Sequence, residues 1–82
     1  MDVLMSTIEA DRTVDARGAA CPGPLMELIG AFRDAESGAV VALLTDEEQS
    51  LTDVPEWVAE SGNEVLDTED LGTHYRITVR RS

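Results

Sequence analysis

Lysine is absent from the chain: all six basic residues are arginine, against 17 aspartates and glutamates. The net charge of -11 repels phosphate backbones and argues against direct binding of nucleic acid. Two explanations of this acidity stay open. One is a solvated surface that keeps the protein in solution, and the other is adaptation to a high-salt cytoplasm. We favour the second, halophilic explanation because it accounts for the missing lysine as well as for the sign of the charge.

Cysteine and histidine occur once each, as Cys21 and His74. A single cysteine cannot form an internal disulfide, and no signal peptide or long apolar run is apparent, so the expected setting is a reducing cytoplasm without a membrane partner. One thiol and one imidazole provide no zinc-type ligand set, and the carboxylates lack the spacing of a calcium-binding loop. The sequence therefore predicts no metal site.

The 82 residues suit one small domain. Residues 1–11 show no clear period and are expected to form a flexible or edge extension, which leaves residues 12–82 as the domain. Runs of apolar and β-branched side chains predict four strands, at residues 13–16, 39–44, 64–68 and 74–80.

Two helices are expected between these strands. In the first, from Pro22 to about residue 36, apolar residues recur at helical spacing, at Leu25, Leu28, Ile29 and Phe32. For the second, Asp53 is the expected N-cap, with Pro55 in the first turn, Glu56 completing a capping box and Gly62 at the end. The order βαβαββ predicts a two-layer α/β sandwich, with two helices on one face of a four-stranded mixed sheet.

Cys21 is the leading candidate for chemistry because it directly precedes the first helix. A thiol at this place lies near unpaired backbone N–H groups and the positive end of the helix dipole, which favour the thiolate. Pro22 and Pro24 stiffen the first turn and would hold the thiol outward, whereas a lone cysteine in an arbitrary soluble domain is more often a small buried hydrophobe. Two roles are open for Arg17: a positive charge near the thiol, or an ordinary solvated loop residue.

Other groups offer weaker candidates. His74 falls on the outward phase of the last strand, so no Cys–His dyad is predicted. Gly18 and Gly23 do not make a phosphate-binding loop. Met26 is either a core residue or part of a docking surface beside the thiol, and Asp46 is either a solvated loop residue or part of the rim of the same site.

Residues 17–24, Arg-Gly-Ala-Ala-Cys-Pro-Gly-Pro, resemble the Gly-x-x-Cys-Pro-x-Pro motif of the TusA/SirA-like sulfurtransferase family. The resemblance covers about residues 12–81 and includes Thr45-Asp46, Asp53-Val54-Pro55, Gly62 and Tyr75. It implies that Cys21 accepts a persulfide sulfur from a donor protein, such as a cysteine desulfurase or a rhodanese-like protein, and passes it to an acceptor protein. It also implies a site supported by Arg17, Gly18, Pro22, Gly23 and Pro24.

This resemblance implies a protein-to-protein sulfurtransferase that serves tRNA thiolation, molybdenum-cofactor biosynthesis or other sulfur metabolism. No cofactor is needed, since the thiolate itself attacks the donor's persulfide. Two alternatives stay open: a non-catalytic regulatory or redox-sensing interaction module with an exposed thiol at Cys21, and a purely structural domain in which that thiol is inaccessible.

Overall fold

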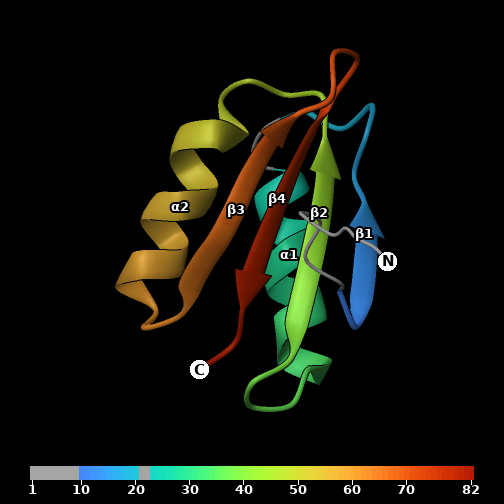
Figure 1. Cartoon of the computed structure of the whole chain (residues 1–82). Coiled ribbons are helices and arrows are strands. Elements are labelled where there is room, and N and C mark those ends of the chain that lie inside the picture. Colours follow the sequence, from blue (N-terminus) through green and yellow to red (C-terminus); the bar gives the residue numbers. More distant parts are fainter. Residues whose placement is uncertain (1–9, 21–22) are drawn as a thin grey trace, which may run out of the picture.

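The computed structural model describes residues 10–20 and 23–82 (Figure 1). Its elements follow the order β1 (Arg12–Asp15), α1 (Gly23–Asp34), β2 (Val40–Thr45), α2 (Ser50–Glu60), β3 (Glu64–Asp70) and β4 (Tyr75–Arg80). The predicted βαβαββ order is therefore confirmed. The prediction for residues 1–9, and those for Cys21 and Pro22, lie outside the described residues. Neither described helix is long and apolar enough to cross a membrane.

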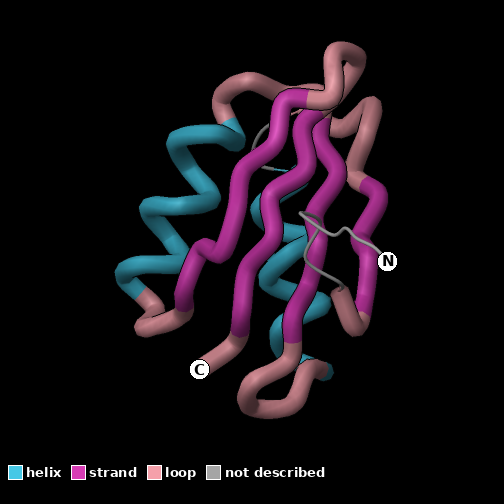
Figure 2. Tube along the Cα trace, viewed as in Figure 1, coloured by secondary structure: helices cyan, strands magenta, loops and turns pink. Residues whose placement is uncertain are grey.

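The four strands form one mixed sheet in the order β1-β2-β4-β3. β1 pairs with β2 in parallel, whereas β4 pairs antiparallel with both β2 and β3. β2 is a central strand, and it is buried at Val41 and Leu43 and also, on the opposite face, at Ala42, which matches its almost continuously apolar sequence. The parallel pairing has a consequence: the loops that follow β1 and β2 leave the sheet at the same end, as the trace in Figure 2 shows.

The core lies between the helices and one face of the sheet. Leu28 from α1 and Val54 and Val58 from α2 are fully buried against the sheet. The sheet contributes the inward-facing residues Val41, Leu43, Ile77 and Val79, which are also fully buried. Each such side chain stabilises the fold by about 1.5 to 3 kcal/mol through its removal from water. The predicted two-layer sandwich with both helices on one face is confirmed.

The start of α2 differs from the prediction. The helix begins at Ser50, one turn before the expected cap Asp53, and its N-cap Gln49 makes no side-chain capping bond. The cause is the turn that precedes it: the N–H groups of Ser50 and Leu51 donate to the carbonyls of Glu47 and Glu48 at 3.1 and 3.0 Å, so the chain is already winding helically there. The prediction of a capping box with Glu56 is therefore wrong.

The end of α2 follows the prediction. Gly62 adopts a φ of 80°, a left-handed conformation that glycine reaches without strain. Its N–H donates to the Ala59 carbonyl at 3.2 Å, and the next N–H, from Asn63, donates to Val58 at 2.9 Å. These two bonds satisfy carbonyls of the last helical turn that otherwise lack partners.

Candidate functional site

The loop between β1 and α1 is held to the sheet at its first residue. Ala16 is buried, and its N–H donates to the Leu44 carbonyl of β2 at 2.8 Å. The N–H of Ala19 then turns back to the Ala16 carbonyl at 3.2 Å. The predicted nucleophile Cys21 and its neighbour Pro22 lie outside the described residues.

Asp46 anchors the middle of this loop. Its two carboxylate oxygens, Oδ1 and Oδ2, both accept the N–H of Gly18, at 3.1 and 3.0 Å. A backbone N–H bonded to a carboxylate makes a stronger hydrogen bond than a neutral pair does. The bond joins loops that are 28 residues apart in the sequence, which the parallel pairing of β1 and β2 brings to one end of the sheet.

Gly18 is required here by its backbone. It adopts a φ of 87°, and a Cβ at this position would meet no atom within 4 Å. Another residue would therefore fit the space but would be strained by about 1 to 2 kcal/mol in the left-handed region. The left-handed conformation of Gly18 presents its N–H to Asp46.

Arg17 is paired with Asp15. The Nε and Nη2 groups of Arg17 donate to the two carboxylate oxygens of Asp15 at 2.9 and 2.7 Å, and the Arg17 backbone N–H donates to Oδ1 at 3.1 Å. These hydrogen bonds lower the pKa of Asp15 to about 2, and the same pairing raises the pKa of Arg17. Both side chains are about half exposed, so the pair adds little stability. The guanidinium charge of Arg17 is therefore engaged by its own neighbour.

On the other side of Cys21, α1 starts in a tight turn. The N–H of Gly23 donates to the Ala20 carbonyl at 2.7 Å, and a Cβ on Gly23 would lie only 3.1 Å from that of Ala19. Pro24 is fully buried. The N–H of Gly23 is thus occupied, and because Pro24 has none, Leu25 carries the next N–H of the first turn.

Met26 lies on the exposed side of α1. Its side chain is 57% exposed, which excludes the alternative of a core residue. It lines an open groove of about 610 Å³ that runs along the helix from Gly23 to Asp34. Gly18 and Asp46 are joined by a hydrogen bond at the loop, and Arg17 precedes Gly18 there. Among the described residues Met26 makes no such contact and instead contributes exposed surface beside the start of the helix.

His74 occupies the β3–β4 hairpin, and its Nδ1 lies 2.9 Å from the Thr73 hydroxyl. It is half-buried, and its charge makes a minor contribution to the low pKa of Asp15. Within residues 10–20 and 23–82, no three His, Cys, Asp or Glu side chains gather as a metal site.

Sequence reasoning missed two contacts of the loop. The partner of Arg17, Asp15, stands two residues away where the strand ends, a spacing that favours a local pair once the chain leaves the sheet. Asp46 was expected only at the rim, and the bond that makes it an anchor is a property of the tertiary fold.

The family model for the sulfurtransferase TusA matches residues 12–81. The chain belongs to the TusA family. A relative from Archaeoglobus fulgidus, named "Putative sulfur carrier protein", is 44% identical over 68 residues, which cover 83% of this chain and 93% of the relative. A relative of the same name from Halobacterium salinarum is 30% identical over 80 residues, which cover 96% of this chain and 99% of the relative.

The fold is shared with the solved structure of a SirA-like protein. The crystal structure of a SirA-like protein from Desulfitobacterium hafniense matches with a TM-score of 0.74 and 25% identity, covering 84% of this chain and 95% of that one. The resemblance that the Cys-Pro-Gly-Pro motif predicts is therefore confirmed at the level of family and fold.

Proposed function

We propose that this protein is a sulfur carrier in which Cys21 takes one sulfur atom from a donor protein and delivers it to an acceptor protein. The Cys21 thiolate attacks the outer sulfur of the donor's persulfide. A bond forms between the Cys21 sulfur and that outer sulfur, the donor's S–S bond breaks, and the donor cysteine leaves as a thiolate with the electron pair. Delivery repeats the exchange, with an acceptor nucleophile attacking the outer sulfur and Cys21 leaving as the thiolate.

The observation that carries the proposal is the frame around this cysteine in a TusA-family chain. In the sequence Cys21 stands between a loop that Asp46 anchors through Gly18 and a first helical turn that contains the buried Pro24. A helix N-terminus favours anions, so it favours both the thiolate that attacks and the persulfide anion that results. The names of the relatives from Archaeoglobus fulgidus and Halobacterium salinarum support the same role.

The proposed donor is a cysteine desulfurase or a rhodanese-like protein, and the acceptor is a second protein of a sulfur-delivery route. Exposed Met26, beside the start of α1, is a candidate contact for either partner. An unpaired reactive thiol is best preserved in a reducing cytoplasm, which is the compartment that we propose.

Mass spectrometry tests the transfer. After incubation with a cysteine desulfurase and cysteine, or with a rhodanese and thiosulfate, the protein is expected to gain the mass of one sulfur atom. The gain should disappear after treatment with a reductant and should be absent from Cys21→Ser. No adduct with either donor, in a protein whose Cys21 reacts with iodoacetamide, would favour the regulatory thiol instead.

We also propose that the acidic surface is an adaptation to a salty cytoplasm. High salt screens the mutual repulsion of the carboxylates, so the urea midpoint of unfolding should rise between dilute buffer and molar KCl. A protein that is most stable in dilute buffer would contradict this part of the proposal and leave the sulfur transfer untouched.

A further inference from the structure

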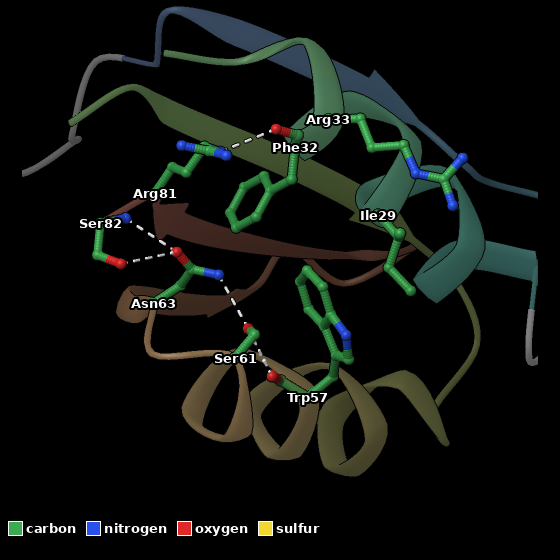
Figure 3. Close-up of a pocket in the computed structure, with 8 residues that line it drawn as sticks. All are labelled: Ile29, Phe32, Arg33, Trp57, Ser61, Asn63, Arg81 and Ser82. Carbon is green, nitrogen blue, oxygen red and sulfur yellow. Dashed lines mark hydrogen bonds between the residues drawn. The ribbon is translucent and has the colours of Figure 1, made fainter. Parts of the chain in front are cut away.

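A second hollow lies at the end of the molecule away from the cysteine loop, between the last turns of α1 and α2 (Figure 3). Its volume is about 300 Å³, and it is lined by Ile29, Phe32, Arg33, Trp57, Ser61, Asn63, Arg81 and Ser82. Phe32 is nine residues after Gly23 on α1, which at 1.5 Å per residue separates the two ends of the helix by about 14 Å. A molecule bound in this hollow would therefore leave the cysteine end of the helix accessible.

The hollow has an apolar wall. The rings of Phe32 and Trp57 lie 5.6 Å apart between centroids with a tilt of 52°, so the two helices are joined by an aromatic pair. Phe32 is almost fully buried, whereas Trp57 and Ile29 are only half-buried and present part of their apolar surface to the hollow. The indole N–H of Trp57 has no hydrogen-bond partner among the residues that the structure describes and is not one of the buried unpaired groups, so it is open to solvent or to a bound partner.

Two arginines flank this wall. In Figure 3, Arg81 lies on one side of the hollow and Arg33 on the other, with the rings of Phe32 and Trp57 between them. The Nε group of Arg81 donates to the Phe32 carbonyl at 2.9 Å, which holds the side chain in place and leaves its Nη groups available. Within the described part of the chain, no carboxylate lies within 4.0 Å of either guanidinium.

The lack of carboxylate partners is notable in a chain with 17 acidic residues and six basic ones. The arginines at positions 17, 76 and 80 each pair with a carboxylate, whereas Arg12, Arg33 and Arg81 have no such partner among the described residues. Of these three, only Arg33 and Arg81 lie beside the same aromatic wall. Part of the reason that these arginines lie at the C-terminal end of α1 is electrostatic, because a cation stabilises the negative end of a helix dipole. This effect does not account for the partly exposed apolar surface of Trp57 and Ile29 beside them.

We propose that this hollow is a docking site for a segment of a partner protein in which an apolar side chain is flanked by Asp or Glu residues. The apolar side chain would cover Trp57 and Ile29, and the carboxylates would pair with Arg81 on one side and Arg33 on the other. Arginine and tryptophan are the residue types that most often dominate protein interfaces. Two arginines without a carboxylate partner flank this hollow, whereas the groove beside Met26 has one, Arg12, so charge complementarity favours this site for a segment with two carboxylates.

The single tryptophan of the chain makes the test direct. The probe is the acetylated and amidated peptide Gly-Asp-Leu-Asp-Gly, with Gly-Asn-Leu-Asn-Gly as its uncharged counterpart. Binding is followed by Trp57 fluorescence and by the indole N–H signal in ¹⁵N NMR at low salt. The aspartate peptide is expected to shift this signal in a saturable way, and the asparagine peptide to bind about threefold to tenfold more weakly.

Protein variants locate the contact. Arg33→Gln should weaken binding of the aspartate peptide by about threefold and leave binding of the asparagine peptide unchanged. Arg81→Lys retains the charge and should retain most of the affinity, whereas Arg81→Gln should lose it. Arg12→Gln is the matched control, since Arg12 is an arginine in the groove beside Met26 and its removal should have no effect. Urea unfolding of each variant separates weaker binding from loss of the fold.

Three outcomes would overturn the proposal: equal binding of the two peptides, an equal effect of Arg12→Gln, or no shift of the indole signal at saturating peptide. A shift of that signal on diluting the protein alone would assign the hollow to a second copy of the chain instead. The experiment does not involve Cys21, so its failure and the failure of sulfur transfer are distinguishable.

Discussion

The charged side chains at the two ends of α1 differ in whether they have partners within the protein. At the N-terminal end, the carboxylates of Asp15 and Asp46 are occupied by Arg17 and by the Gly18 N–H, and they hold the loop before Cys21. At the C-terminal end, Arg33 and Arg81 have no carboxylate partner in the described part of the chain and flank an aromatic wall. The first end uses its charges to shape backbone, and the second keeps its charges available. This difference fits the two proposals, sulfur transfer at the first end and docking of a partner segment at the second.

Blocking the cysteine gives the largest contrast between the two ends. Alkylation of Cys21 with iodoacetamide, or Cys21→Ser, should abolish sulfur loading entirely. The affinity for the Gly-Asp-Leu-Asp-Gly peptide should remain unchanged, because the hollow lies about 14 Å along the helix. Mass spectrometry and Trp57 fluorescence on the same samples measure both effects. A parallel loss of peptide binding would show that the two ends are coupled.

Alanine substitutions at Gly18 and Gly30 compare the effect of backbone strain on stability with the effect of helix propensity. Gly18→Ala should lower the free energy of unfolding by about 1 to 2 kcal/mol, because alanine is strained at a φ of 87°. Gly30→Ala is the matched change within α1, where a Cβ also meets no atom within 4 Å, and it should raise that free energy by up to about 1 kcal/mol. Urea unfolding measures both. A neutral Gly18→Ala would mean that the loop relaxes without strain.

The anchor at Asp46 can be compared with a similar bond at the other end of the sheet. Asp11 accepts the Val40 N–H through Oδ2 at 2.9 Å, much as Asp46 accepts that of Gly18. Asp46→Asn and Asp11→Asn should each lower the free energy of unfolding by about 1 kcal/mol. Only Asp46→Asn should slow sulfur loading, because of these two bonds only the one at Asp46 holds the loop that leads to Cys21.

In the Asp46→Asn variant, the pH dependence of Cys21 alkylation distinguishes two roles of Asp46: holding the loop in position, and acting on the thiol through its negative charge. If the anchor holds the thiol at the helix N-terminus, losing it should raise the pKa of the Cys21 thiol toward the value of a free cysteine. A lower thiol pKa in the variant would instead mean that the negative charge of Asp46 dominates, and would contradict a positioning role.

The smallest expected effect is the acid dependence of the Asp15–Arg17 pair. The pKa of Asp15 is lowered from 3.8 to about 2 by hydrogen bonds from Arg17. A carboxyl with a lowered pKa stabilises the fold above pH 4 and loses that contribution as the pH falls from about 4 to 2. Asp15→Asn should therefore lose less stability than the parent chain over this interval. Identical acid unfolding curves would show that solvent screens the pair completely.

The sequence predicted the elements and their order well, because each has a local signal. Alternating or continuous apolar runs mark the strands. A glycine, Gly62, marks the end of α2, and in the structure it adopts the left-handed φ of 80° that favours glycine. The start of α2 was the main error. Asp53, Pro55 and Glu56 form a persuasive local start signal, but the turn that buries Ser50 begins the helix earlier, and burial within the fold outweighs the local cap.

The sequence by itself determined the family and the single cysteine on which the proposed chemistry depends, because the Cys-Pro-Gly-Pro motif and its position before a helix are contiguous in the chain. Only the tertiary structure decided what surrounds the two ends of α1. The Asp46–Gly18 bond spans 28 residues, and Arg81 reaches Phe32 across 49. Such contacts depend on which strand ends and helix ends the sheet order brings together, which no local pattern records.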